Sequence, residues 1–144
     1  MAYVNAYLTF NNNCEEAFNF YKHVFGGTFK ELSRFKDMPS MDGYMLPVEA
    51  REKIMHISLP ISKETILMGS DTNPMFGAVS MGKNISLSVN AESRDEADSI
   101  FQKLSEGGTV TMPIASTFWN AYFGMLIDKF DLVWMVNFDE APRS

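Results

Sequence analysis

The spacing of apolar residues predicts two amphipathic helices. In the segment 15–27, apolar side chains recur at the spacing of one helix face, at Ala17, Phe20, Tyr21, Val24 and Phe25. In the segment 95–108 the same stripe returns, at Ala97, Ile100, Phe101 and Leu104. Both segments end in paired glycines, Gly26-Gly27 and Gly107-Gly108, and glycine is a common helix terminator. We therefore expect two helices that each bury one face.

Runs rich in β-branched and aromatic residues predict eight strands around these helices. The expected strands are Asn5–Phe10, Thr28–Phe35, Lys53–Ile61, Glu64–Gly69, Asn84–Val89, Val110–Ile114, Ala121–Ile127 and Leu132–Phe138. Segments with Pro and Gly but no period predict a long irregular loop over Lys36–Glu52 and a linker over Asp71–Lys83. The Ser62-Lys63 turn joins two of the strands in a hairpin.

The order strand, helix, three strands thus occurs twice, about 80 residues apart. With one helix per module, an alternating parallel sheet is excluded, so the predicted class is α+β. We expect two βαβββ modules, residues 1–72 and 82–144, with curved, mostly antiparallel sheets around a cavity. At 144 residues the chain suits one compact core, so we predict that 1–144 form a single domain.

Charge and cysteine content narrow the classes of partner. The net charge of −6 and pI of about 4.8 disfavour nucleic acid and anionic membrane surfaces, which are themselves negative. No apolar run reaches the roughly 18 residues of a membrane span. The single cysteine, Cys14, has no partner for an intrachain disulfide, and the first residues lack a secretory signal pattern. A cytoplasmic protein is expected.

Several motifs resemble the PhnB-like branch of the vicinal-oxygen-chelate superfamily, which includes glyoxalase I and the bleomycin and fosfomycin resistance proteins. The motifs that carry the resemblance include 7–10 (YLTF), 14–18 (CEEAF), 24–27 (VFGG), 67–71 (LMGSD), 84–87 (NISL), 104–108 (LSEGG), 117–124 (TFWNAYFG) and 134–137 (WMVN). The resemblance implies a glyoxalase-like fold and a homodimer. In this family the last turn usually has glycine where this chain has Asp131, which implies a small local cost in stability.

Proteins of this kind have also carried a demethylubiquinone methyltransferase label. A usual methyltransferase binds its cofactor at a glycine-rich turn after the first strand of a parallel βαβ sheet. This chain has no comparable glycine-rich turn, so we disfavour that activity and expect no cofactor.

The resemblance also locates the positions that hold metal ligands in metal-using superfamily members. Alignment by strand places Asn5, Met68, Asn84 and Met135 there. Amide and thioether groups are poor ligands for Zn, Mn or Mg, and the chain has only two histidines, His23 and His56. We predict a pocket without a metal ion.

The expected pocket residues are Asn5, Tyr7, His56, Met68, Asn84, Trp119, Tyr122 and Met135. The Asn5 and Asn84 amides either face a ligand or satisfy neighbouring backbone. His56 is either a general base, or a donor to an anion, or a structural or interface residue. The aromatic segment 117–124 either walls a pocket or packs in the core. Cys14, near a helix start, is a weaker candidate nucleophile without a local base.

Two functional hypotheses follow. The first is a metal-free protein that binds a small organic molecule in an apolar, aromatic-rimmed pocket. The second is a glyoxalase- or dioxygenase-type enzyme of the same superfamily, which either holds a metal or uses His56 or Tyr122 as acid or base. The sequence leaves open whether a reaction is catalysed. A third class, a protein that binds partners through a hydrophobic surface, requires a filled interior.

Overall fold

The computed structural model describes residues 2–37, 47–73 and 77–140. The chain divides into two compact units, Met1–Ser80 and Met81–Ser144, and each is described below by itself. Among the described residues, neither helix has the length and apolar character needed to cross a membrane.

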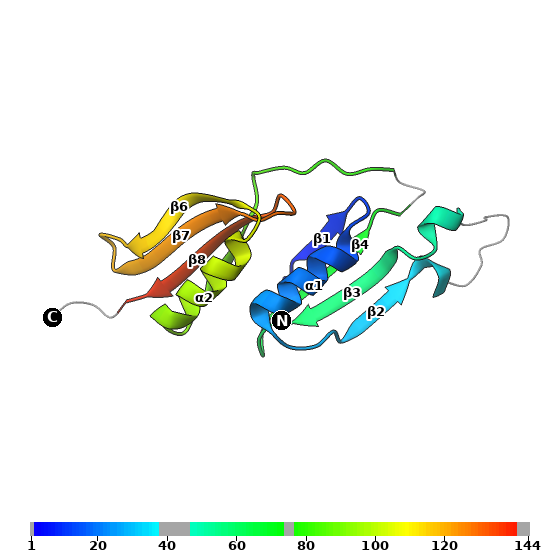
Figure 1. Ribbon diagram of the computed structural model, residues 1–144. Coiled ribbons are helices and arrows are strands. Elements are labelled where there is room, and N and C mark those ends of the chain that lie inside the picture. The colour runs from blue at the N-terminus through cyan, green and yellow to red at the C-terminus, as the bar shows by residue number, and fades with distance from the viewer. Residues whose placement is uncertain (1, 38–46, 74–76, 141–144) are drawn as a thin grey trace. The chain divides into compact units, whose positions relative to one another are not determined.

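The first unit has the predicted order of strand, helix and three strands (Figure 1). Its elements are β1 (Tyr7–Phe10), α1 (Cys14–Phe25), β2 (Glu31–Arg34), the 3-10 helices η1 (Phe35–Asp37) and η2 (Val48–Ala50), β3 (Ile54–Pro60) and β4 (Ile66–Asp71). The sheet order is β1-β4-β3-β2. Strand β1 pairs parallel to β4, and the other two pairs are antiparallel.

The second unit repeats this plan. Its elements are β5 (Ser86–Asn90), α2 (Arg94–Ser105), β6 (Thr109–Ser116), β7 (Ala121–Ile127) and β8 (Val133–Asp139), with sheet order β5-β8-β7-β6. Again the first strand pairs parallel to the last, β5 with β8, and the rest is antiparallel. The α+β class and the twofold βαβββ order are confirmed.

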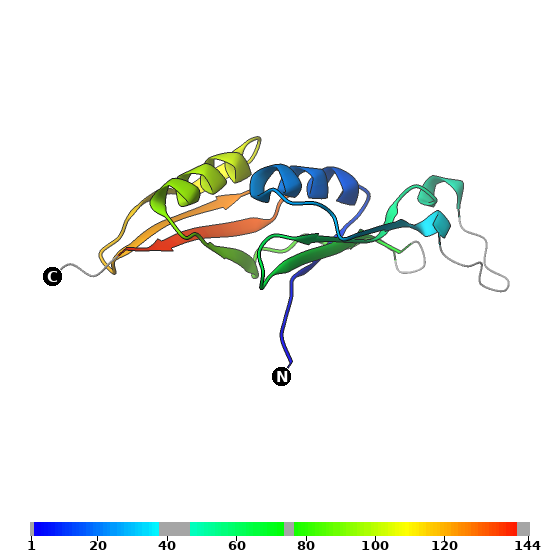
Figure 2. The ribbon, with the colours of Figure 1, turned by 90° about the horizontal axis from the view of Figure 1, so that it is seen from below.

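Each α-helix covers one face of its own sheet, and no α-helix of the described residues covers the opposite face (Figure 2). We call the uncovered face the open face. Glycine permits the close approach of helix to sheet, because a Cβ at Gly69 would lie 2.6 Å from the Phe18 ring of α1. In the second unit a Cβ at Gly124 would lie 2.7 Å from the Phe101 ring of α2. A glycine on a central strand thus serves the same purpose in both units.

The two helices begin differently. In α2, Ser93 Oγ accepts the Glu96 N–H at 3.0 Å, and the Glu96 carboxylate accepts the Glu92 N–H at 3.1 Å. This is a capping arrangement within the local sequence. In α1, Asn13 makes no side-chain cap. Instead Asp71, at the end of β4, accepts the first amide of the helix, so the cap of α1 comes from a distant part of the chain.

Some boundaries differ from the expectation. Strand β4 extends to Asp71, which the sequence analysis had assigned to the linker, because the Asp71 side chain is buried and hydrogen-bonded. The expected loop Lys36–Glu52 holds η1 and η2, and its residues 38–46 lie outside the described part. Residues 74–76 of the expected linker also lie outside it.

The turn between β7 and β8 is organised by one buried carboxylate. Asp128 is 2% exposed and accepts the Phe130 N–H, the Leu132 N–H and the indole N–H of Trp134. Asp131 adopts a φ of 70°, the left-handed region that favours glycine. Asp131 therefore has the backbone conformation for which a small local cost in stability is expected.

Candidate functional site

The open face of the first sheet holds a row of side chains from all four strands. Tyr7 pairs with Met68, Met68 with Ser58, and Ser58 with Glu31. Partners across a sheet point to the same side, about 5 Å apart. The row therefore runs across β1, β4, β3 and β2 on the open face.

His56 connects the two ends of this row. Its Nδ1 lies 3.2 Å from the Tyr7 hydroxyl, and its Nε2 lies 3.6 Å from a Glu31 carboxylate oxygen. The Tyr7 and His56 rings lie 5.7 Å apart. Ile57 is fully buried toward the helix, whereas His56 is partly exposed, as strand alternation predicts. The result is a continuous chain from Tyr7 through His56 to Glu31.

Ser58 adds a hydroxyl without a partner to the same row. It is 4% exposed, and within the described residues its Oγ makes no hydrogen bond. A buried hydroxyl without a partner costs about 1–3 kcal/mol relative to one that is hydrogen-bonded. Its neighbour in the row is Met68, whose flexible side chain can move to admit a ligand. Such an atom is a natural contact for a polar ligand.

Much of this face is polar as well. Strand alternation and pairing place Thr9, Ser70 and Ser33 beside the row, whereas Met68, Ile66 and Pro60 are its apolar members. The face is therefore more polar than the apolar pocket expected from the sequence. The physical reason is the register, which gathers polar residues from four strands on one side while Leu8, Phe10 and Ile57 face the helix.

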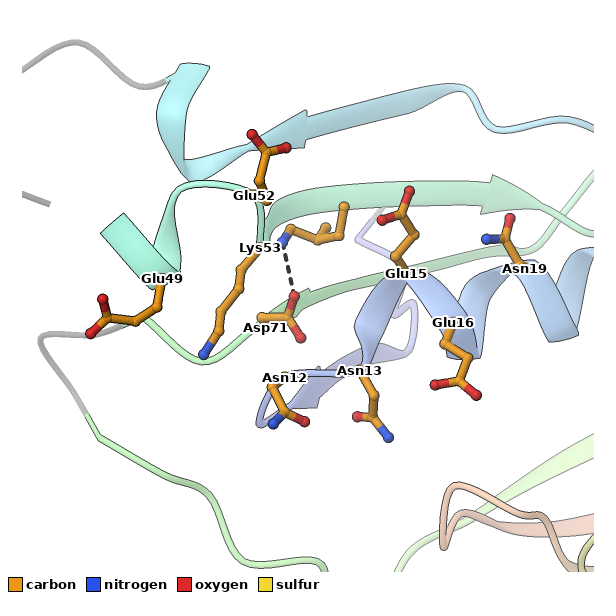
Figure 3. A pocket seen from close by; sticks show the side chains of 10 residues that line it. Asn12, Asn13, Glu15, Glu16, Asn19, Glu49, Glu52, Lys53 and Asp71 are labelled. Atoms are coloured by element: carbon orange, nitrogen blue, oxygen red, sulfur yellow. Dashed lines mark hydrogen bonds between the residues drawn. The ribbon is translucent and has the colours of Figure 1, made fainter. Parts of the chain in front are cut away.

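A separate polar pocket of about 590 Å³ lies beside the start of α1 (Figure 3). It is lined by Asn12, Asn13, Glu15, Glu16, Asn19, Glu49, Glu52, Lys53, Ile54 and Asp71. The Asp71 carboxylate accepts the Cys14 N–H at 3.0 Å and the Ile54 N–H at 2.8 Å. Asp71 therefore links β4 to the starts of α1 and β3, and both of its carboxylate oxygens accept backbone hydrogen bonds.

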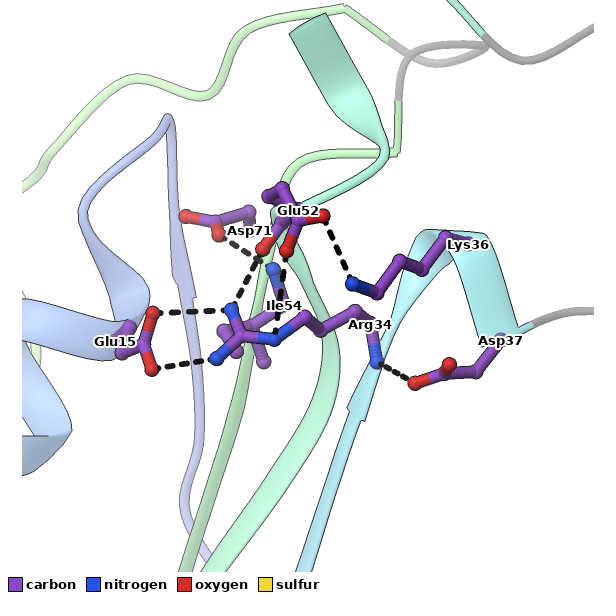
Figure 4. Close-up of polar contacts among 7 residues, drawn as sticks. All are labelled: Glu15, Arg34, Lys36, Asp37, Glu52, Ile54 and Asp71. Atoms are coloured by element: carbon purple, nitrogen blue, oxygen red, sulfur yellow. Dashed lines mark hydrogen bonds and ion pairs between the residues drawn. The ribbon is translucent and has the colours of Figure 1, made fainter. Parts of the chain in front are cut away.

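Arg34 holds the acidic groups at the edge of this pocket (Figure 4). Its guanidinium donates to both carboxylate oxygens of Glu15, at 3.0 and 2.7 Å, and to the Glu52 carbonyl at 2.7 Å. The hydrogen bond from Arg34 lowers the pKa of Glu15. Lys36 pairs with the Glu52 carboxylate at 2.8 Å. These carboxylates are engaged in ion pairs with Arg34 and Lys36.

Cys14 is fully buried at the start of α1. Burial, and then the nearby carboxylates of Asp71 and Glu15, raise the pKa of its thiol. A nucleophilic cysteine needs a thiolate, so this environment argues against the nucleophile considered from the sequence.

The open face of the second sheet is apolar at its centre, whereas its edge strand β5 contributes Ser86, Ser88 and Asn90. Successive partners across β5, β8, β7 and β6 are Ser88, Met135, Met125 and Met112. Beside them, Trp119 lies 6.0 Å from the Phe123 ring and is half exposed. This surface has the methionine and aromatic character that the sequence analysis expected of a pocket.

Tyr122 lies on the other face of the same sheet. Tyr122 and Met125 are three residues apart on β7, so their side chains point to opposite faces of the sheet. The Tyr122 hydroxyl donates to Asp98 of α2 at 2.5 Å. The Arg94 guanidinium lies 4.2 Å from its ring centre. The hydrogen bond to Asp98 raises the pKa of Tyr122. Tyr122 therefore does not share a face with Met135 and is held by its helix.

Asn5 and Asn84 each lie two residues before the first strand of their unit, outside the strands in which they were expected. Asn5 is partly exposed and Asn84 is exposed. Of the predicted pocket residues in the first unit, the structure brings Tyr7, His56 and Met68 together on one face. In the second unit it places Met135 and Trp119 at the apolar face.

The residues present do not fit a divalent metal centre of the superfamily type. Within the described residues, no three His, Cys, Asp or Glu side chains cluster as a metal site. The expected ligand positions hold amides and thioethers, namely Asn5, Met68, Asn84 and Met135, which are weak donors for Zn, Mn or Mg.

Comparison with known proteins assigns the family. The model of the family described as 3-demethylubiquinone-9 3-methyltransferase matches residues 2–137. The chain belongs to this PhnB-like family. The PhnB-like chain is 39% identical to the protein PA1353 from Pseudomonas aeruginosa, with a TM-score of 0.84, covering 98% of this chain and 100% of that one.

Two further relatives extend the likeness. Protein YjdN of Escherichia coli (strain K12) is 29% identical over an alignment 143 residues long, and the match covers 93% of this chain and 93% of that protein. A PhnB protein from Bacillus cereus shares the fold, with 24% identity, a TM-score of 0.71 and coverage of 95% and 99%. The PhnB-like fold is that of glyoxalase/bleomycin resistance protein/dioxygenase structures, as the sequence predicted.

Sequence reasoning missed Glu31 and Ser58. Alternation along the segments 28–35 and 53–61 places each on one side of its strand, which was a usable signal. Alternation does not determine the strand register, and it is the register that puts Glu31 opposite Ser58 and both residues near His56.

Proposed function

We propose that this PhnB-like protein binds a small polar organic molecule on the open face of its first sheet, without a metal ion. The observation that carries the proposal is the connected chain of Tyr7, His56 and Glu31 beside the unpartnered hydroxyl of Ser58. Small-molecule sites hold a few convergent polar groups of this kind. The family and fold, common to many ligand-binding and catalytic proteins, support the proposal without naming a ligand.

Met68 offers a direct test, because it lies in the row between Tyr7 and Ser58. Protein labelled with ¹³C-methyl methionine is mixed with fractions of a bacterial metabolite extract, and the Met68 methyl signal is followed by NMR. We expect one fraction to shift it, and native mass spectrometry then gives the mass of the bound molecule.

Ser58→Ala is expected to weaken that binding, because the hydroxyl is lost with little change in volume. Ser88→Ala is the matched control, since Ser88 occupies the open face of the second sheet. If no fraction perturbs Met68, or if both variants bind alike, the proposal for this face is wrong.

Methyl transfer does not fit this unit. The connection from β1 to α1 is Asn11-Asn12-Asn13, without a glycine-rich turn, and β1 lies at the edge of a mostly antiparallel sheet. These features do not form the usual nucleotide-type cofactor cradle. We therefore propose no methyltransferase chemistry, although the family description carries that term.

A second candidate function is metal-independent acid–base catalysis through His56. The observation that favours it is the position of the imidazole between a phenol and a carboxylate, the arrangement that orients a general base. Tyr122, the other residue considered from the sequence, is bonded to Asp98 on the helix side. Conversion of the bound molecule by the natural protein, abolished by His56→Gln with binding kept, would establish this function.

The assembly and location predicted from sequence remain proposals. We propose a homodimer, because edge strands such as β1 and β2 can be covered by pairing with a second copy. Light scattering at micromolar concentration should give twice the chain mass of 16.3 kDa. A monomer would contradict this. We also propose that the protein acts in the cytoplasm.

A further inference from the structure

Donors and acceptors can be assigned along the Tyr7–His56–Glu31 chain from the chemistry of its groups. In a neutral imidazole one ring nitrogen donates and the other accepts. A carboxylate only accepts, so the nitrogen that faces Glu31, Nε2, carries the hydrogen in the complementary arrangement. Nδ1 then accepts, and the Tyr7 hydroxyl at 3.2 Å donates its only proton to it.

This direction decides what the cluster can offer to a ligand. With its proton directed at His56, the Tyr7 oxygen keeps only acceptor lone pairs. Glu31 is an acceptor whose side chain is 63% exposed, and the single N–H of a neutral His56 is directed at it, with Nε2 3.6 Å from the carboxylate oxygen. Ser58 and the neighbouring hydroxyls can donate or accept. The fixed polar atoms of this face are therefore acceptors, and they match a ligand that donates.

The charge of the face leads to the same conclusion. The strand residues on this face include one carboxylate, Glu31, and none of those described is Lys or Arg. Arg34 of β2 is turned away from the face, since its guanidinium binds Glu15 of α1. An anion bound here would meet the Glu31 carboxylate, and His56 is the one strand residue described on this face that can carry a positive charge. The chain as a whole carries a net charge of −6, which further repels anions.

The Tyr7 ring supplies a third contact for a cation. Tyr7 is 48% exposed, so part of its aromatic face is open to a bound molecule. An ammonium group over such a ring is attracted by the electron-rich face. The Glu31 carboxylate on one side of His56, and the Tyr7 oxygen and ring on the other, therefore each offer contacts to a positive group.

We propose that the ligand class of this site is a small organic ammonium compound. The inference rests on the proposed function, because it specifies the ligand of the same face. The ammonium donates to Glu31, and a polar substituent reaches Ser58, the cross-strand partner of Glu31.

Three probes of one size test the charge preference. Ethanolamine, ethylene glycol and glycolate share a two-carbon hydroxyl skeleton and carry a positive, zero and negative charge near neutral pH. Each is titrated into ¹³C-methyl-methionine protein in amine-free, low-salt buffer, and the Met68 methyl signal reports binding. We expect ethanolamine to bind about fivefold more tightly than ethylene glycol, the size of an exposed ion pair, and glycolate to bind most weakly.

Two variants test whether the charge of Glu31 itself determines ethanolamine binding. Glu31→Gln should lower the ethanolamine affinity about fivefold, to that of ethylene glycol. Glu52→Gln is the matched control, because Glu52 is similarly exposed but pairs with Lys36. It should leave ethanolamine binding unchanged.

The outcomes distinguish this inference from the proposed function. If glycolate or ethylene glycol binds as well as ethanolamine, the face binds small molecules but the ammonium class is wrong. If Glu52→Gln weakens binding as much as Glu31→Gln does, the preference is a long-range effect and the assigned contact is wrong. If none of the three probes shifts Met68, both the inference and the proposed binding face are refuted for molecules of this size.

Discussion

The structure makes Asp71 the residue whose substitution should damage the first unit most specifically. It is 3% exposed, and its two carboxylate oxygens accept the Cys14 N–H at 3.0 Å and the Ile54 N–H at 2.8 Å. One amide begins α1 and the other begins β3. Asp71→Asn keeps the shape of the side chain but replaces one acceptor oxygen by an NH₂ group, which faces an N–H donor.

The expected loss can be worked from these two bonds. A hydrogen bond to a charged group contributes about 1.5–3 kcal/mol, and the substitution removes one such bond and makes the other neutral. Relief from burying a charge offsets part of the loss. We expect a decrease of about 2–3 kcal/mol in the free energy of unfolding. At a typical urea dependence, this lowers the midpoint by about 1–2 M.

Urea unfolding followed by circular dichroism measures the midpoint, and amide hydrogen exchange locates the effect. The amides of Cys14 and Ile54 should lose protection first. Asp37→Asn is the control, because Asp37 also accepts a backbone amide, from Arg34 at 2.9 Å, but is exposed. If the Asp71 variant loses less than about 1 kcal/mol, or no more than the Asp37 variant, the assigned role is refuted.

Three further predictions concern stability. Burial raises the pKa of the Cys14 thiol, so between pH 8 and 9.5 the unfolded chain releases a proton that the folded chain keeps. The free energy of unfolding, measured with urea, should therefore fall as pH rises, by up to about 1.4 kcal/mol per pH unit, and an equal slope in Cys14→Ser would contradict this. Gly69→Ala should lower stability by about 2–3 kcal/mol, because its Cβ would lie 2.6 Å from the Phe18 ring; an unchanged midpoint would disprove that close contact. At its φ of 70°, Asp131 costs about 0.5–1 kcal/mol relative to glycine. Asp131→Gly should therefore raise the melting temperature slightly, and a lower melting temperature would count against strain there.

Much of the fold could be predicted from local patterns. The two apolar stripes at helical spacing give α1 and α2 within two or three residues at each end. Alternation gives the strands, with β7 at its predicted bounds of Ala121–Ile127. These patterns are decided by which side of an element is buried, and that information lies in consecutive residues.

The side on which Tyr122 lies could not be predicted in this way. In the segment 121–127 both alternating sets are apolar or aromatic, so the helix-facing set is not marked by polarity. The structure selects the set that contains Tyr122 and Leu126, because Gly124 between them gives the Phe101 ring room to pack.

The candidate site shows the same division between sequence and structure. By itself, the sequence determined the twofold βαβββ plan, the family, and the presence of Tyr7, His56 and Met68 on strands. Tertiary structure alone decided that Glu31 and Ser58 join them, since these residues come from strands whose register depends on pairing across the sheet. Register is a long-range property, because a shift of one residue would turn every side chain of a strand to the other face. The sequence therefore supplies the individual polar residues of the open face, and the pairing of β1, β4, β3 and β2 brings them together.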